Sequence, residues 1–199
     1  MIFNIVAGLA LTGSLATAPV VRVDFTGPIT TVTPMPPSPM LRRQSGLPLG
    51  DVAQPAFDAD FATQGYFSAF ALSKDGGYGY AVNANSLGAA RDMALMQCLD
   101  QNESCLIVAE IIPQGYRPPA IGEVFLNPEI GAYYFSPGPE VNGMRAMAIS
   151  EDGAWAFNWG YTTQGEADAA VLQTCQDNRS MQLPTEQDWP CFLVPGAGQ

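Results

Sequence analysis

The sequence predicts an α+β fold in which two strand-strand-helix-strand repeats form one pseudo-symmetric antiparallel sheet with helices on one face. Two observations predict it. Residues 69–98 and 146–175 align without gaps and are identical at nine of thirty positions. Each copy also passes from alternating small and bulky residues, typical of half-buried strands, to an apolar stripe at helical spacing. We therefore expect one structural unit that is used twice.

Each repeat begins with a predicted β-hairpin. YFSAFALS and MRAMAIS are the expected first strands, and an Asp-Gly turn follows each of them. The second strands, YGYAV and WAFNW, carry aromatic residues on one face, which we expect to be the core face beneath a helix. Ser86 is the predicted N-cap of the first helix, and Thr163 to Glu166 fits a capping box for the second. CLIVAEII and CFLVP are predicted to be buried third strands.

Composition divides the chain into five segments. Residues 1–18 form an apolar run with a small-x-small cleavage pattern at its end, which predicts a secretory signal peptide. An uncleaved N-terminal anchor and a buried cytoplasmic segment are the alternatives. Residues 19–64 are rich in proline and predict a flexible tether. The repeats occupy 65–112 and 142–199, and the Pro/Gly-rich connector 113–141 is expected to pack on the domain through its aromatic residues.

The four cysteines fall at matching places in the two copies, at the helix ends and at the starts of the third strands. Four cysteines allow three pairings, and the repeat favours Cys98 with Cys105 and Cys175 with Cys191. Such disulfides predict an oxidising compartment, so we expect a periplasmic or secreted protein. A four-thiolate zinc site is disfavoured because C-x-x-C spacing is absent.

Both copies share the pattern A-x-S-x-x-G-x-aromatic, followed in the first by A-x-x-x-A-L-x-x-C and a second cysteine before apolar residues. This pattern resembles the bacterial family catalogued as domain of unknown function 4189, in two tandem copies. The matching residues are Ala71, Ser73, Gly76, Tyr78, Gly79, Ala90, Ala94, Leu95, Cys98 and Cys105, then Ala148, Ser150, Gly153, Trp155, Ala167, Leu172, Cys175 and Cys191. The second copy has Ala156 where the pattern prefers glycine, and a longer loop between its cysteines. The resemblance implies a small secreted or periplasmic protein and names no reaction.

Charge and composition exclude several functions. The formal net charge is −11 with a single lysine, Lys74, so we expect no nucleic-acid partner, and membrane contact only if the N-terminal segment stays uncleaved. The absence of histidine excludes Ser-His-Asp, Cys-His and histidine-ligated metal sites. Lys74 lies beside a turn, where a Schiff-base cofactor is not expected, and the acidic loops lack the EF-hand pattern. We predict no cofactor and no metal.

Few residues are candidates for chemistry or binding. Asp75 and Asp152 are equivalent acids that could act as a catalytic pair, but aspartate before glycine is also what a tight turn requires. The neighbouring Ser73 and Ser150 are expected to hydrogen-bond to those turns. Trp159 and Tyr161, at the end of the second aromatic strand, are the candidate exposed pair for ligand binding.

We therefore favour a non-catalytic, exported, disulfide-stabilised interaction module with an unknown protein or glycan partner. One alternative is a carboxylate-dependent hydrolase of envelope or glycan material. Another is an inhibitor or immunity-type binding partner of a secreted protein, which the acidic surface would suit.

Overall fold

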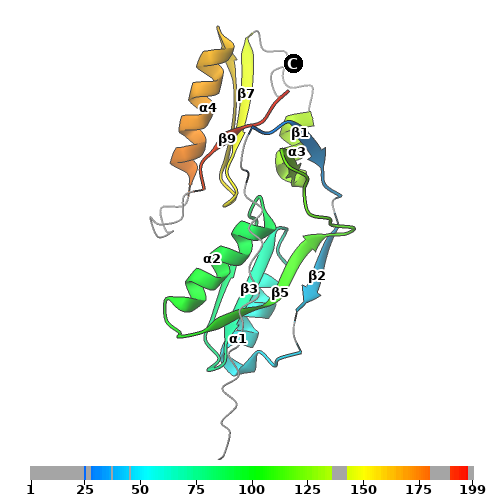
Figure 1. Ribbon diagram of the computed structural model, residues 1–199, viewed down its shortest axis with the longest axis vertical. Coiled ribbons are helices and arrows are strands. Elements are labelled where there is room, and N and C mark those ends of the chain that lie inside the picture. The colour runs from blue at the N-terminus through cyan, green and yellow to red at the C-terminus, as the bar shows by residue number, and fades with distance from the viewer. Residues whose placement is uncertain are drawn as a thin grey trace, which may run out of the picture.

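The predicted α+β class is confirmed in the computed structural model, which describes Phe25 and residues 28–36, 38–44, 46–135, 143–179 and 189–196. The predicted signal peptide at 1–18 lies outside these residues. The molecule is elongated, with residues 65–112, here the first unit, at one end and the described part of residues 142–199 (143–179 and 189–196), the second unit, at the other (Figure 1). Within the described ranges, no helix is both long enough and apolar enough to cross a bilayer.

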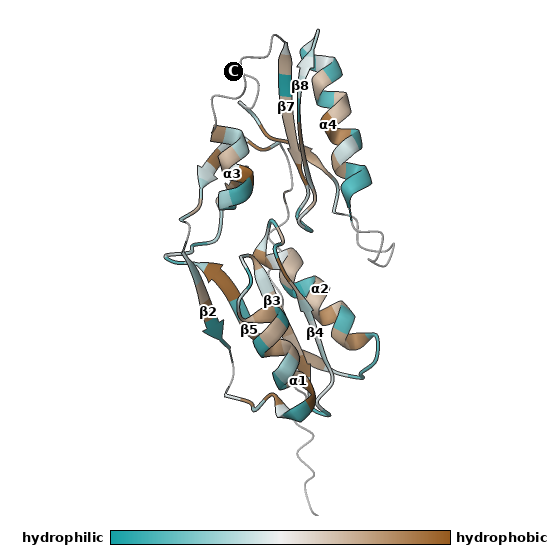
Figure 2. Ribbon diagram, turned by 180° about the vertical axis from the view of Figure 1, so that it is seen from behind, coloured by the Kyte–Doolittle hydropathy of each residue, from teal (hydrophilic) through white to brown (hydrophobic). Residues whose placement is uncertain are grey.

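Both units contain two strands, a helix and a third strand in that order. The first unit has β3 (Ser68–Ser73), β4 (Tyr78–Ala81), α2 (Leu87–Leu99) and β5 (Cys105–Pro113). The second unit has β7 (Met144–Ile149), β8 (Trp155–Tyr161), α4 (Gln164–Asn178) and β9 (Phe192–Leu193). In both units the second strand lies beside the helix (Figure 2).

Each helix begins at the predicted cap. The Ser86 hydroxyl accepts the Ala89 N–H at 3.0 Å, at the start of α2. At α4 the reciprocal capping box is complete, because Thr163 Oγ1 accepts the Glu166 N–H at 3.3 Å and Glu166 accepts the Thr163 N–H at 3.0 Å. These bonds satisfy N–H groups that the helix itself leaves unpaired.

The prediction of one shared sheet is wrong, because the strands form separate sheets. The first unit's sheet has the order β2-β5-β3-β4, and the second unit's sheet has the order β8-β7-β9. Strand β2 (Pro39–Arg43) pairs antiparallel with β5 and occupies the edge that a shared sheet could have used. The units instead meet through a loop of the first and the hairpin turn of the second, between Asn85 and residues 150–154.

The prediction that residues 19–64 form a flexible tether is also wrong for the part that the structure describes. In addition to β2, it contains β1 (Thr31–Pro34), helix α1 (Gly50–Ala56) and a π-helical turn, η1 (Phe57–Phe61). Phe57 and Phe61 are buried and contact Phe70 of β3. The many prolines suggested an extended chain, but two phenylalanines four residues apart supply a helical apolar face.

The described part of the connector, residues 113–135, packs on the second unit. Strand β6 (Glu123–Leu126) pairs in parallel with β1, and helix α3 (Pro128–Phe135) follows it. Leu126 and Ile130 share a buried cluster with Met147 of β7. Hydrogen bonds from Arg117 and from the Ala120 N–H lower the pKa of Glu123 to about 2, and the same carboxylate accepts the Thr33 hydroxyl of β1 at 2.7 Å.

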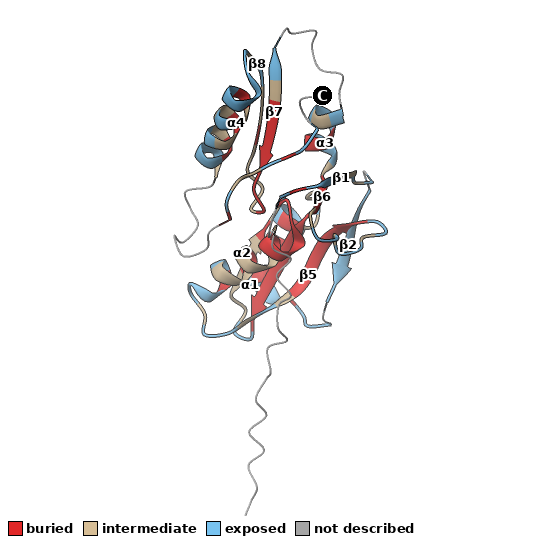
Figure 3. Ribbon diagram, turned by 45° about the horizontal axis from the view of Figure 1, so that its top comes forward, coloured by how far each residue is buried: buried red, intermediate tan, exposed pale blue. Residues whose placement is uncertain are grey.

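The prediction that the helices lie on one face of the sheet is also wrong, because both faces of each sheet are covered. The small residues of β3 and β4 pack against α2, whereas Phe70, Tyr78 and Tyr80 pack on the opposite face with α1 and η1. The second unit repeats this division, with α4 on the small-residue face and α3, β1 and β6 towards the bulky face. Buried residues accordingly line the inner strands, while the outer side of α4 is exposed (Figure 3). The aromatic residues of β4 and β8 thus face segments other than the helices we expected; they are partly buried, and Trp159 is exposed.

Candidate binding surface

The two predicted disulfides are present. Cys98 pairs with Cys105 and Cys175 with Cys191, with Cα atoms 6.2 Å apart in both, and no cysteine is free. Each bridge joins the C-terminal part of a helix to the start of the third-strand segment. Such bonds persist in an oxidising environment and fix each helix on its sheet.

The first hairpin is a solvent-exposed turn. Ser73 Oγ accepts the N–H groups of Asp75 at 3.3 Å and Gly77 at 3.0 Å, which is the structural role predicted for this serine. Its hydroxyl also lies 3.2 Å from Oδ1 of Asn102, whose amide donates to the Cys98 carbonyl at 2.7 Å. The turn is therefore tied to the C-terminal end of α2, and the Asp75 side chain is exposed.

The second hairpin has different contacts. Ser150 Oγ donates to the Trp189 carbonyl at 2.6 Å and so does not bind its own turn as predicted. The Asp152 side chain is only 2% exposed; it forms an ion pair with Arg179 at 3.3 Å and accepts the Ala154 N–H at 3.2 Å. Asp152 therefore stabilises the hairpin and its junction with the end of α4.

Asp75 and Asp152 do not form a catalytic pair. The first hairpin lies at the C-terminal end of α2, whereas the second contacts Asn85 and Ser86 at its N-terminal end. A helix of 13 residues is about 20 Å long at 1.5 Å per residue. Two carboxylates must lie far closer than this to share one substrate bond, so the geometry does not support the paired-carboxylate mechanism.

A buried carboxylate in the first unit has hydrogen-bond partners for both of its oxygen atoms. Glu110 of β5 is 1% exposed and accepts hydrogen bonds from Arg91 at 2.5 Å, from Arg42 and from Gln44. Burial by itself raises the pKa of Glu110, but the bonds from Arg91, Arg42 and Gln44 outweigh it and hold that pKa below its ordinary value. The cluster joins β2, α2 and β5. Among the described residues, no group of cysteine, aspartate or glutamate side chains has the geometry of a metal site.

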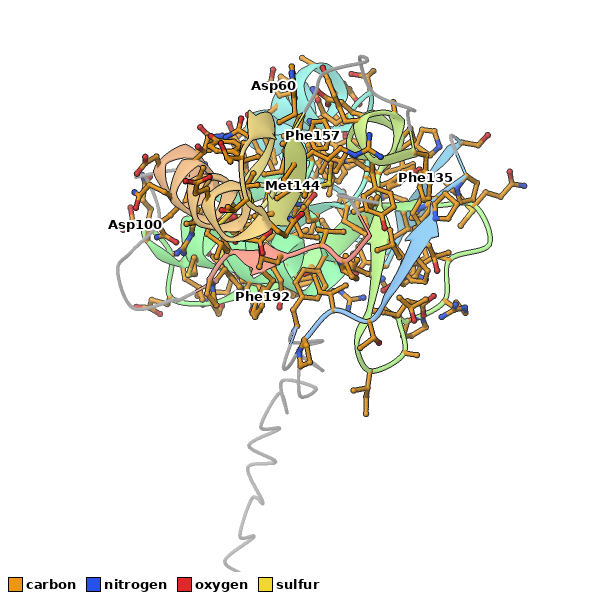
Figure 4. The ribbon with its side chains drawn as sticks, turned by 90° about the horizontal axis from the view of Figure 1, so that it is seen from above. Asp60, Asp100, Phe135, Met144, Phe157 and Phe192 are labelled. Atoms are coloured by element: carbon orange, nitrogen blue, oxygen red, sulfur yellow. A yellow bond between two sulfur atoms is a disulfide. The ribbon has the colours of Figure 1, made fainter. Side chains whose placement is uncertain are left out.

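An aromatic row lies along the second unit, formed by Tyr133 of α3 and by Trp155, Phe157 and Trp159 of β8. Tyr133 lies 5.1 Å from Trp155 and 6.4 Å from Phe157, and Phe157 lies 5.6 Å from Trp159, between ring centroids. Tyr133 is 48% exposed and Trp159 is 45% exposed, so the row is open to solvent at both of these residues. Figure 4 shows Phe157 and Phe192 on opposite sides of β7, as the strand order β8-β7-β9 requires.

The structure separates the predicted pair Trp159 and Tyr161. Gly160 has φ of +88°, and the register of β7 and β8 shifts between Met144 and Arg145, which is a β-bulge. One extra residue turns Tyr161 to the opposite face, where it packs with the apolar cluster beneath α4. Trp159 is therefore a binding candidate and Tyr161 is not part of the same surface. Tyr133 was missed because it comes from the connector.

A groove of about 480 Å³ lies on the other side of the β8 edge. Its lining consists of residues 153–158, which run from the hairpin into β8, and of Thr174 and Asn178 on α4. The Asn178 side chain donates to the Trp155 carbonyl at 2.9 Å, and the Asn158 amide lies 3.4 Å from the Thr174 hydroxyl. Backbone atoms of β8 and polar atoms of α4 therefore face a common space.

Comparisons with models of known protein families, with curated proteins and with solved structures found no match for this chain.

Proposed function

We propose that this chain is a non-catalytic, exported interaction module that binds a partner protein through the aromatic row. The observation that carries the proposal is the exposure of Trp159 on a disulfide-bonded unit and of Tyr133 on helix α3, whose ring lies against Trp155 of that unit. Tyrosine and tryptophan dominate the energetics of protein interfaces because they bury a large area with little loss of side-chain entropy. A rigid support lowers the cost of binding further.

The shape of the row favours a polypeptide over a glycan. Neighbouring rings are inclined to one another by 42° between Tyr133 and Trp155, 47° between Tyr133 and Phe157 and 43° between Phe157 and Trp159. A sugar ring stacks best on a flat aromatic face, whereas rings that are inclined to one another leave recesses that the side chains of a polypeptide can fill.

The disulfides support an oxidising compartment, and periplasmic or secreted localisation is part of the proposal. Membership of the two units in the family catalogued as domain of unknown function 4189 stays a prediction that agrees with it. An inhibitor or immunity-type role would use the same surface, and identification of the partner would distinguish it.

The proposal is tested by photo-crosslinking in the intact cell envelope. A photoreactive phenylalanine analogue replaces Trp159 in one variant and Ile121, which is 97% exposed in the loop before β6, in a matched control. We expect a defined crosslinked protein from position 159 and none from position 121. The same crosslinks from both positions, or from neither, would contradict the proposal.

Affinity for the captured partner provides the second measurement. We expect Trp159→Ala to weaken binding by roughly 10- to 100-fold, since an exposed tryptophan contributes mainly to the interface. Met40→Ala, a change at a residue of β2 that is 42% exposed, is the control and is expected to bind as the original protein does. Equal affinities for the two variants would contradict the proposed surface.

A further inference from the structure

Strand β8 is a sheet edge without the usual protection. It lies at the end of the order β8-β7-β9 and its seven residues, WAFNWGY, include no charged residue and no proline. Proteins commonly protect edge strands with charges, prolines or short length, because an open edge can pair with another chain. The edges of the first sheet follow this rule, since β2 carries Pro39, Arg42 and Arg43, and β4 has only four residues.

The backbone of β8 presents hydrogen-bonding groups at this edge. The Met147 carbonyl of β7 accepts the Val194 N–H at 2.9 Å, so Met147 faces β9 and its partner Phe157 faces away from β7. The backbone carbonyl of Trp155, two residues before Phe157, also points away from β7, because it accepts a hydrogen bond from the Asn178 side chain of α4. Among the described residues, none accepts the Phe157 N–H.

The first unit closes the equivalent edge with a side chain. Tyr80 is equivalent to Phe157, and its outward N–H donates to Gln97 Oε1 of α2 at 2.7 Å. The residue equivalent to Gln97 in the second unit is Thr174. Its hydroxyl donates to the Ala170 carbonyl of its own helix at 2.9 Å, and its shorter side chain leaves the groove between α4 and β8 open.

We propose that the β8 edge accepts an extended segment of a basic partner protein as an added strand. The inference rests on the proposed function and specifies how the partner binds. Main-chain hydrogen bonds to Phe157 and its neighbours would hold the segment, as in other cases of strand addition. Alternate side chains of the added strand would then face the aromatic row on one side and α4 on the other.

The negative charge of the protein indicates which kind of segment binds at the β8 edge. The chain has a formal net charge of −11, and Asp177 is exposed on α4 next to the groove-lining Asn178. These charges attract a cationic segment and oppose pairing of β8 with β8 of a second copy. The expected segment therefore alternates apolar residues, which contact the aromatic row, with lysine or arginine, which faces Asp177.

The probe is an acetylated, amidated octapeptide of alternating valine and lysine, added to the full-length oxidised protein. We expect saturable binding by calorimetry, shifts of the Trp155, Phe157 and Trp159 amide signals in NMR spectra, and at least tenfold slower hydrogen exchange of the Phe157 N–H. An octapeptide of alternating valine and glutamate should bind at least tenfold more weakly. A valine-lysine peptide with alternate backbone amides N-methylated should also lose at least tenfold, because it cannot donate the strand bonds.

Thr174→Gln introduces the side chain with which the first unit closes its own edge. We expect it to weaken octapeptide binding at least tenfold, whereas Ala169→Gln adds the same side chain at an exposed position of α4 outside the groove and should change nothing. The proposal is overturned if the octapeptide does not bind, if Thr174→Gln binds it equally well, or if the Phe157 N–H becomes protected by dimer formation without peptide. Crosslinking from position 159 that persists undiminished in Thr174→Gln would overturn strand addition and leave the proposed function standing.

Discussion

The two hairpins of this protein have nearly the same sequence and opposite surroundings. In the first, Lys74 and Asp75 are exposed to solvent, whereas Ser150-Glu151-Asp152-Gly153 is packed between the two units. Residues Lys74 and Glu151 occupy equivalent positions, and the first is exposed while the second is only 4% exposed. The difference shows how one of two turns with similar sequences can become a contact between the units.

The Glu151 carboxylate and backbone carbonyl both contribute to the docking of the second hairpin. Glu151 accepts the Ser86 hydroxyl at 3.0 Å, and its backbone carbonyl accepts the N–H groups of Asn85 at 2.9 Å and Ser86 at 3.3 Å. These donors lie at the N-terminus of α2, where the helix dipole favours a negative group. The same carboxylate accepts the Phe25 N–H at 2.6 Å. A lysine ammonium at this position could not accept these two hydrogen bonds.

Charge reversal at Glu151 and at Lys74 tests whether the two hairpins are differently placed. Of the substitutions proposed here, Glu151→Lys is expected to have the largest effect on the free energy of unfolding. We expect Glu151→Lys to lower the free energy of unfolding by about 3–5 kcal/mol, since it buries a cation and leaves the Ser86 hydroxyl and the Phe25 N–H without the carboxylate that accepts their hydrogen bonds. Lys74→Glu, its mirror at an exposed tip, should stay within about 0.5 kcal/mol of the original protein. Denaturant unfolding under oxidising conditions measures both, and similar losses in the two variants would show that the hairpins are not differently placed.

The disulfides of the two units close loops of different length. Cys98 and Cys105 are 7 residues apart, and Cys175 and Cys191 are 16 residues apart. Loop-closure entropy predicts that removal of the first bridge costs about 2 kcal/mol and removal of the second about 3 kcal/mol. The double alanine variants, compared by thermal and denaturant unfolding, check this order. A larger loss for the shorter loop would mean that contacts made by the cystine itself outweigh chain entropy.

Local features were predictable from the sequence because their causes lie within a few residues. The caps at Ser86 and Thr163 and the two cysteine pairings follow from spacing and from the alignment of the copies. The cover on the bulky face of each sheet was not predictable in this way, since it depends on segments distant in the chain. Phe57 and Phe61, four residues apart, were the available signal for the first cover.

The candidate surface was only partly predictable for the same reason. Exposure of Trp159 follows from its place at a strand end, and Gly160 before Tyr161 was the available signal for a bulge that reverses the side chain. The contribution of Tyr133 depends on the docking of α3, which no local pattern specifies. The difference between Gln97 and Thr174 is visible in the alignment, but its meaning depends on which N–H groups point outward.

The two units also differ in how closely the second strand packs against the helix, and the substitutions that test this have the smallest expected effects. A Cβ atom at Gly79 would lie 2.4 Å from the Cys98 nitrogen and 2.6 Å from the Ala94 carbonyl oxygen, whereas the equivalent Ala156 carries its methyl group in a buried site. Helix α2 therefore lies closer to its strand than α4 does. We expect Gly79→Ala to cost about 2 kcal/mol through overpacking against backbone atoms, and Ala156→Gly to cost about 1 kcal/mol through the lost methyl group and added chain entropy. Denaturant midpoints of the two variants measure this, and a neutral Gly79→Ala would contradict the close approach of α2, since the nearest atoms that the methyl group would meet are backbone atoms of that helix.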